Sequence, residues 1–237
     1  MEYYQLAAII FFFSAIQSVL GVGLLLFGTP TLLLLGFSYS EVLWVLLPCS
    51  CSMSVIQILQ GLTLIKSKKN VYFLTIPALI IGLLLVIKLD YLIDIKKLVG
   101  VFLILAAALR ITNSSYVYDI LATEKFKRIS YLLIGFVHGL SNLGGAPLTV
   151  VASASFKDKD SIRANIAFVY FALAVSQLVV LSAYQREVFD VTNLIFIPFV
   201  VINHFLLQKF LISSVNDRNF NIFVSLIVLT FGLLCLF

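Results

Sequence analysis

Long apolar runs constrain this chain more than any other feature of its sequence. Hydrophobic residues make up 62% of the 237 positions, charged residues only 11%, and the mean hydropathy is +1.11. Soluble globular domains carry about 45–50% apolar and about 25% charged residues. A helix needs about 20 apolar residues to cross a bilayer, so the chain has room for about eight such helices and little else. The sequence therefore predicts an all-α integral membrane protein, with the lipid bilayer as a partner.

The apolar runs divide the chain into two halves joined by a basic connector. We expect a first transmembrane repeat over residues 1–115, a connector over 116–128 and a second repeat over 129–237. The first run is too long for the core of a signal peptide and has no basic residue ahead of it, so it is interpreted as a retained span. The expected spans are 4–27, 41–65, 71–89, 97–111, 129–155, 163–184, 191–211 and 220–237.

The charged residues lie in the short segments between the apolar runs. The formal net charge is +5, which in a membrane protein reflects loop residues that set topology and not nucleic-acid binding. If every run crosses the membrane, basic residues divide almost equally between the two sides, and the acid-free cluster from Lys66 to Lys69 favours its own side as cytoplasmic. Cys49, Cys51 and Cys235 lack the further ligands of a metal site, so we expect no metal and no cofactor.

A short motif recurs in the two halves. Gly28-Thr29-Pro30 matches Gly145-Ala146-Pro147, 117 positions later, and the same spacing joins Gln60 to Gln177. Proline lacks an N–H and clashes with the preceding turn, and glycine lets the backbone leave helical geometry. We therefore expect a helix break at each Gly-x-Pro motif, within two four-helix repeats around a common centre. Four full spans per half would make the halves parallel, whereas one re-entrant segment per half would allow inversion.

The second motif ends a polar, glycine-rich run that begins at His138. Irregular backbone survives at membrane depth only against protein or a water-filled cavity, and interrupted helices in both halves mark the substrate sites of transporters. A helix that restarts after a break presents free N–H groups and the positive end of its dipole, which favour an anion. The alternative is that small residues only allow close helix packing. The candidate substrate-binding residues here are Ser141, Asn142, Gly144, Gly145, Pro147, Gly28, Thr29 and Pro30.

A few polar side chains outside the motifs are further candidates. Arg163 begins the sixth span, where it either marks the membrane interface or offers charge-assisted hydrogen bonds to an oxyanion; Asn165 adds an amide donor. His138 titrates near neutral pH and is the candidate for coupling protons to anion movement. Three amide side chains lie within apolar runs, where they bond neighbouring helices or line a substrate path. These are Gln57, Gln60 and Gln177.

The paired motifs, their repetition, and Arg163-Ala164 after the second motif resemble the TauE/SafE family of sulfite-exporter-like membrane proteins. The resemblance covers most of the chain. The segment from Gly135 to Pro147 is similar to the family's glycine-rich segment, whereas from Gly21 to Pro30 leucine and phenylalanine replace most of the expected glycines. The resemblance implies a secondary transporter that exports sulfite, organosulfonates or related small oxyanions across the inner membrane of a bacterium.

Three classes of function remain open at this point. A secondary transporter of a small anionic substrate is favoured, driven by a coupling ion (a proton or sodium) or by the substrate's own gradient. An anion-selective channel is the alternative, and it would give unitary currents in place of saturable flux. An enzyme is disfavoured, because the sequence contains no carboxylate pair or nucleophile constellation, and no catalytic residue is expected. No feature of the sequence defines an oligomeric state.

Overall fold

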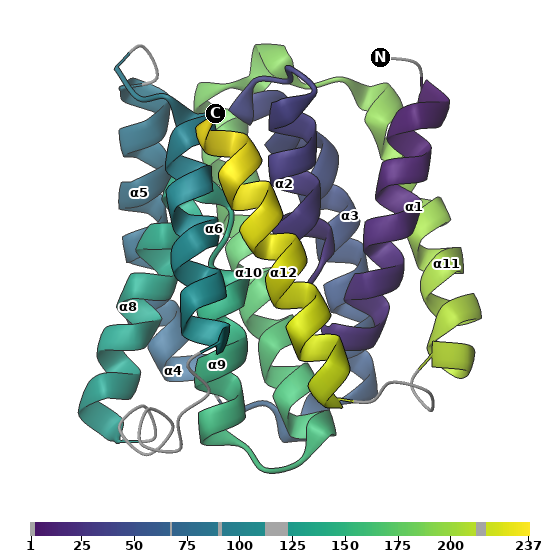
Figure 1. The fold of residues 1–237 in the computed structure, drawn as a ribbon, viewed down its shortest axis with the longest axis vertical. Helices are drawn as coiled ribbons and strands as arrows, with labels where there is room; N and C mark the ends of the chain where they lie inside the picture. Colours follow the sequence, from purple (N-terminus) through teal and green to yellow (C-terminus); the bar gives the residue numbers. More distant parts are fainter. Residues whose placement is uncertain (1–2, 67, 90–91, 112–122, 212–216) are drawn as a thin grey trace.

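The computed structural model describes residues 3–66, 68–89, 92–111, 123–211 and 217–237, without the side chains of 19–20, 109–111, 208–211 and 217–224. The described residues form a bundle of helices that contains no strand (Figure 1). Three of the helical segments are long and apolar enough to cross a membrane, namely Tyr39–Gln60, Lys68–Lys88 and Lys159–Tyr184. The predicted all-helical class is therefore confirmed for the described part of the chain, and the number of full spans stays a prediction.

The helices follow one another with short connections. The first half contains α1 (Tyr3–Leu20), α2 (Leu24–Leu34), α3 (Tyr39–Gln60), η1 (Leu62–Leu64), α4 (Lys68–Asn70), η2 (Val71–Thr75), α5 (Ile76–Lys88) and α6 (Ile95–Ile111). The second half contains α8 (Glu124–Ser141), α9 (Gly145–Ser155), α10 (Lys159–Tyr184), η3 (Arg186–Val188), η4 (Val191–Ile195), α11 (Phe196–Leu211) and α12 (Asp217–Leu236). The predicted connector at 116–128 lies largely outside the described residues.

Side-chain caps begin the two long central helices. Ahead of α3, the Ser38 hydroxyl accepts a hydrogen bond from the Glu41 N–H at 3.3 Å, and the Ser38 N–H donates to the Glu41 carboxylate at 2.7 Å. Ahead of α10, the Asp158 carboxylate accepts from the Ser161 N–H at 2.7 Å. Each cap satisfies N–H groups that have no partner within the helix. These short polar sequences therefore determine where α3 and α10 begin.

The first apolar segment is a helical hairpin and not one continuous span. The chain turns at Gly21, whose φ of 76° favours glycine, and α2 then runs back along α1. Phe13 of α1 stacks on Phe27 of α2, with ring centroids 5.7 Å apart. Gly23 lies so close to α1 that a Cβ there would come within 2.8 Å of the Gln17 nitrogen. Glycine at these two positions therefore permits the turn and the close return of the chain.

The second broken segment is a hairpin of α8 and α9. Asn142 adopts a left-handed conformation (φ 62°) at the end of α8, and its N–H donates to the His138 carbonyl at 2.7 Å. Asparagine is among the few residues that take this conformation readily. Gly144 then lies against His138, where a Cβ would come within 2.7 Å of the His138 Cβ. The second predicted break is thus real, but it lies just before Gly145.

The predicted break at Gly28-Thr29-Pro30 is wrong. These residues lie buried inside α2, which continues through Pro30 to Leu34. A proline inside a helix removes one hydrogen bond, a loss that α2 tolerates here, and the Thr31 hydroxyl adds a bond to the Phe27 carbonyl at 2.7 Å. In the second half, Pro147 lies in the first turn of α9, where its missing N–H would have had no helical partner. Neither proline ends a helix.

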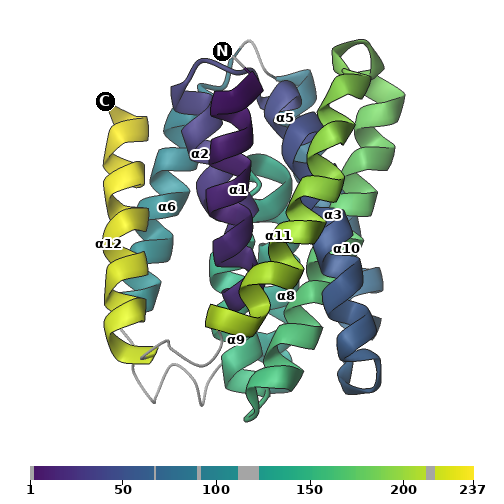
Figure 2. The same cartoon turned by 90° about the vertical axis from the view of Figure 1, so that its right-hand side faces the viewer.

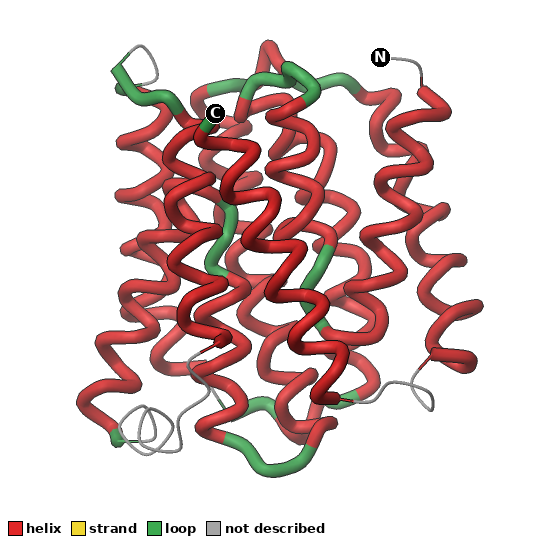
Figure 3. Tube along the Cα trace, viewed as in Figure 1, coloured by secondary structure: helices red, strands yellow, loops and turns green. Residues whose placement is uncertain are grey.

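The two hairpins open toward opposite ends of the bundle. In Figure 1, α1 begins and α2 ends at the upper end, which carries both termini, whereas α8 begins and α9 ends at the lower end. Figure 3 shows the two hairpin turns as loops within the bundle, between its two ends. The second helices of the two hairpins also match in length, with 11 residues in α2 and in α9.

The remaining helices pack around the hairpins in pairs. α3 packs on α10, α6 on α12, α5 on α8 and α1 on α11, and Figure 2 shows α11 beside α1. The contact between α5 and α8 depends on glycine, because a Cβ at Gly135 or Gly139 would overlap the carbonyl oxygens of Thr75 and Leu79. Small residues allow helices in a membrane to approach to backbone contact. Close helix packing therefore explains Gly135 and Gly139, in agreement with the alternative that small residues serve helix packing.

Candidate functional site

Several polar side chains converge at the turn of the second hairpin. The His138 Nδ1 atom accepts a hydrogen bond from the Gly144 N–H at 3.1 Å, which leaves the proton of the neutral imidazole on Nε2. That Nε2 is buried and has no hydrogen-bonding partner. The ring lies edge-on to Tyr170 of α10, with centroids 5.9 Å apart. The imidazole thus carries a buried donor without a partner next to α10.

Tyr170 and Gln177 supply further unpartnered groups from α10. The hydroxyl of Tyr170 lies against the start of α9, where a Cβ at Gly145 would overlap it. Neither this hydroxyl nor the nitrogen and oxygen of the Gln177 amide has a well-formed hydrogen bond, although the amide lies close to His138. The first N–H groups of α9 also lack partners within the helix. We call His138, Asn142, Tyr170 and Gln177 the second-hairpin site.

A hydrogen bond joins this site to the first hairpin. The Asn142 amide nitrogen donates to the Thr29 hydroxyl of α2 at 2.9 Å, and both residues are fully buried. The Asn142 side-chain oxygen has no partner. Thr29 therefore reaches the site from the opposite half of the chain, although its motif does not break α2.

The polar side chains of the second-hairpin site are neutral hydrogen-bonding groups. Within the residues that the structure describes, no group of three or more His, Cys, Asp or Glu side chains could hold a metal ion. A buried polar group without a partner costs about 1–3 kcal/mol, so several of them together indicate that a ligand or water completes their bonds. Donors of this kind bind an oxyanion through charge-assisted hydrogen bonds.

The first hairpin carries a polar cluster at the corresponding place. The Gln17 amide of α1 donates to the Ser50 hydroxyl of α3 at 3.3 Å, and the Gln57 amide donates to the Gln17 carbonyl at 3.2 Å. The side-chain oxygens of Gln17 and Gln57 have no partner. Each residue of this cluster has a counterpart at a similar position in the second half of the chain. Gln17 corresponds to His138 (121 positions apart), Ser50 to Tyr170 (120) and Gln57 to Gln177 (120).

Three of these residues escaped sequence reasoning. Gln17, Ser50 and Tyr170 lie in apolar helices without a local motif, and only the spacing of 120 to 121 positions links them to their counterparts. The sequence paired Gln177 with Gln60, which is exposed near the end of α3 and lies away from the hairpin turns.

The other predicted residues lie elsewhere or have structural partners. Arg163 donates from Nη2 to the Ser18 carbonyl at 2.9 Å, near the end of α1 and outside the second-hairpin site. The Ser141 hydroxyl donates to the carbonyl one turn earlier in α8, at 2.7 Å. The Asn165 amide donates to the Leu64 carbonyl at 2.9 Å and accepts from a backbone N–H of the same loop, also at 2.9 Å. Asn165 thus attaches η1 to α10.

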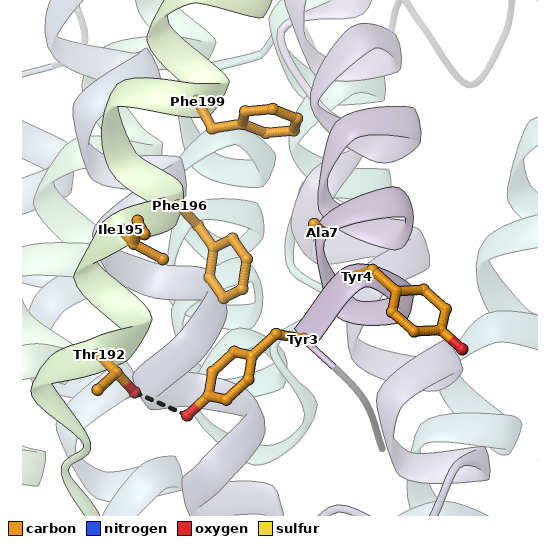
Figure 4. A pocket seen from close by; sticks show the side chains of 7 residues that line it. All are labelled: Tyr3, Tyr4, Ala7, Thr192, Ile195, Phe196 and Phe199. Carbon is orange, nitrogen blue, oxygen red and sulfur yellow. Dashed lines mark hydrogen bonds between the residues drawn. The ribbon is translucent and has the colours of Figure 1, made fainter.

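A spacious groove lies elsewhere and is apolar. It has a volume of about 550 Å³ and runs between the start of α1 and the η4–α11 segment (Figure 4). Its one polar contact among the residues drawn joins the Tyr3 hydroxyl to Thr192 Oγ1 at 3.0 Å. Tyrosines are frequent at membrane–water interfaces. An apolar groove of this kind suits a hydrocarbon chain, and no cationic side chain among the described residues lines it to bind an anion.

Apolar helices around two hairpins, with buried polar groups at both turns, define a multi-pass membrane protein of the transporter class. The chain matches the sequence profile described as Sulfite exporter TauE/SafE over residues 6–235, nearly its whole length, and it belongs to that family. No curated protein and no solved structure matches it. Family membership confirms the predicted resemblance and the prediction that the protein is a transporter and not an enzyme.

Proposed function

We propose that the protein is a secondary transporter that exports small oxyanions, such as sulfite or organosulfonates, and that the second-hairpin site binds the substrate. The observation that carries this proposal is the convergence of His138 Nε2, the Tyr170 hydroxyl and the Gln177 amide, all buried and without partners, beside the start of α9. The positive end of the α9 dipole adds to the attraction of an anion. Gly144 and Gly145 admit the neighbouring side chains, and Asn142 and Thr29 hold the two hairpins together.

We infer that the two halves are inverted repeats with a register of 120 to 121 positions and not 117. Two features support this. The hairpin helices end at residues 20 and 141 and restart at residues 24 and 145, and the two hairpins open to opposite ends of the bundle (Figure 1). Interrupted helices in inverted repeats are a recurring basis of alternating access, in which one half rocks against the other around a fixed site.

The distribution of charge supports export from the lower end. Basic residues in cytoplasmic loops set the orientation of membrane proteins, and we infer that the lower end faces the cytoplasm of a bacterium. The basic residues with described side chains at the lower end are Lys66, Lys68, Lys69, Lys125, Lys127, Arg128, Lys157, Lys159 and Arg163; those at the upper end are Lys88, Lys96, Lys97 and Arg186. An anion leaving the cytoplasm would first meet the more basic end.

His138 is also the proposed site of proton coupling. Its Nδ1 atom accepts a hydrogen bond from the Gly144 N–H, and a second proton on the ring would have to take that position. Protonation would therefore break the bond that fixes the turn ahead of α9 and would place a cation beside the substrate. The groups that face the imidazole, Tyr170 and Gln177, are neutral. Replacing His138 with glutamine should flatten the dependence of transport on pH, and an unchanged profile would refute the coupling.

Flux measurements on the purified protein in liposomes test the proposed function. We expect saturable sulfite uptake with counterflow, and a reduction in the rate of about tenfold or more in Tyr170→Phe, because hydrogen bonds to charged groups contribute about 1.5–3 kcal/mol. The matched control is Tyr184→Phe at the end of the same helix, where the side chain is exposed. Unitary currents without counterflow would indicate a channel, and an absence of any sulfite flux would contradict the proposal.

A further inference from the structure

A second polar cavity lies at the lower end, away from the second-hairpin site. It has a volume of about 130 Å³ and lies between the end of α3, η1 and the first turns of α10. Its polar lining includes Gln57, Gln60, Asp160 and Arg163. A water molecule occupies about 30 Å³ in the liquid, so the cavity has room for a few waters or for one small inorganic oxyanion. We call it the lower vestibule.

Arg163 is the cation of the lower vestibule, and its hydrogen bonds are incomplete. Its Nη2 donates to the Ser18 carbonyl, but its buried Nε has no partner. Among the described residues, the ion pairs within 4.0 Å join Lys97 to Asp94 and Lys127 to Glu124, and none includes Arg163. The Arg163 side chain is half-buried and lies within electrostatic range of the Asp160 carboxylate. A cation with one unpartnered donor therefore lines this cavity.

The bond to Ser18 does not by itself explain the charge. In the second hairpin, the carbonyl of Gly139 occupies the corresponding place, 121 positions after Ser18. That carbonyl accepts a hydrogen bond at 3.3 Å from the neutral hydroxyl of Tyr39, at the start of α3. A neutral donor is thus sufficient to satisfy the end of a hairpin helix. The positive charge at the lower end calls for another partner.

Three further polar side chains lie near Arg163. Gln57, which lines the cavity, is 4% exposed, and its side-chain oxygen has no partner. His204 of α11 is fully buried, has no partner at either ring nitrogen and lies within electrostatic range of Arg163. Asp160 is exposed, lines the cavity and also interacts with Arg163. Its carboxylate would compete with an anion for the guanidinium.

We propose that the lower vestibule is a separate recognition site for a small inorganic oxyanion, with Arg163 as its main ligand and Asp160 as a competing carboxylate. The site rests on the proposed function for its class of substrate, but it uses none of the residues of the second-hairpin site. In the proposed orientation it collects the anion from the cytoplasm. Its volume admits one small inorganic oxyanion such as sulfite or sulfate.

Anion binding to the intact protein in detergent, measured by calorimetry with sulfite and with sulfate, tests this inference. Arg163→Gln should weaken binding about tenfold or more, since it removes a charge-assisted hydrogen bond. Asp160→Asn should strengthen binding a few-fold, because the competing carboxylate is gone. The matched control is Asp158→Asn, which removes the same charge two residues away, outside the cavity, and keeps a side chain that caps α10.

The two variants should change the anion affinity in opposite directions, so Asp160→Asn still tests the inference if Arg163→Gln fails to fold. Asp160 is exposed and its replacement leaves the protein's interior intact, so an unchanged affinity in Asp160→Asn, or the same change in Asp158→Asn, would overturn the vestibule. If neither Arg163→Gln nor Asp160→Asn alters binding while Tyr170→Phe still reduces sulfite flux, the proposed transport function is supported and the vestibule site is refuted. If no anion binds and no flux occurs, both the transport function and the vestibule site are refuted.

Discussion

The second-hairpin site depends on single atoms of a few residues. Gly145 has no Cβ, and this leaves room for the Tyr170 hydroxyl at the start of α9. Asn142 tolerates the left-handed turn and still extends its amide to Thr29. His138 accepts from the Gly144 N–H and so keeps its own proton on Nε2. The donors that we assign to the substrate are those that form no hydrogen bond within the protein.

A methyl group at position 145 should disrupt the site. In Gly145→Ala the new Cβ would overlap the Tyr170 hydroxyl, and we expect a lower melting temperature and a loss of most sulfite flux. The double variant Gly145→Ala with Tyr170→Phe should recover part of the melting temperature, since the hydroxyl is removed, but not the flux. A Gly145→Ala protein with normal stability and normal transport would show that the close contact is not required.

The bond between the hairpins should be measurable as a coupling energy. Thr29→Val and Asn142→Gly each remove one partner of the 2.9 Å hydrogen bond, and glycine preserves the left-handed turn. A double-mutant cycle on thermal stability should give a coupling of about 1 kcal/mol, typical of a buried hydrogen bond. Additive effects of the two substitutions would mean that the hairpins are held together by packing alone.

At the scale of elements, each half consists of a hairpin followed by a long capped helix. α3 begins with a serine cap and α10 with an aspartate cap, and both helices then supply polar groups to a hairpin turn. The Ser161 N–H donates to the Asp158 carboxylate and holds the pKa of that carboxyl below its ordinary value of 3.8. An ionised carboxylate therefore caps the start of α10.

The Asp158 cap should stabilise the protein only while its carboxyl is ionised. Because the pKa is lower in the folded state, the contribution is fully present above pH 3.8 and is lost as the pH falls below that value. Asp158→Asn caps α10 without titrating, so its melting temperature should decline less than that of the wild type between neutral pH and pH 3. Parallel declines for the two proteins would rule out this contribution.

Some elements were predictable from the sequence because their cause is local. Two helix starts depend on residues only three positions apart, Ser38 with Glu41 and Asp158 with Ser161. The polar run up to Gly144 is likewise a clear interruption of an apolar segment. The turn at Gly21 was missed because Pro30 is the stronger breaker in isolation. The helical conformation around Pro30 inside α2 depends on how the hairpin packs.

The polar residues of the site were harder to predict for a related reason. Tyr170 and Gln17 lie in apolar helices, where a single polar side chain gives no indication of its partners. Their roles depend on residues distant in the sequence, namely Ser50 for Gln17, 33 positions away, and Gly145 of α9 for Tyr170, 25 positions away. Gln177 was identified because an amide in a membrane helix is unusual by itself.

At the scale of the whole molecule, the proposed oxyanion path requires that the two hairpins open to opposite sides of the membrane. Leu35 follows the end of α2 at the upper end, and Lys157 precedes α10 at the lower end; both side chains are exposed. If each broken segment crossed the membrane as a full span, the two residues would lie on the same side. With two hairpins they lie on opposite sides, so their positions separate the two arrangements.

Cysteine labelling in oriented membranes measures this most directly. Leu35→Cys and Lys157→Cys would each be introduced into protein lacking Cys49, Cys51 and Cys235 and treated with a membrane-impermeant maleimide. We predict that Lys157→Cys reacts only from the cytoplasmic side and Leu35→Cys only from the opposite side. Reaction of both from the same side would contradict the paired, oppositely opening hairpins and the oxyanion path proposed between them.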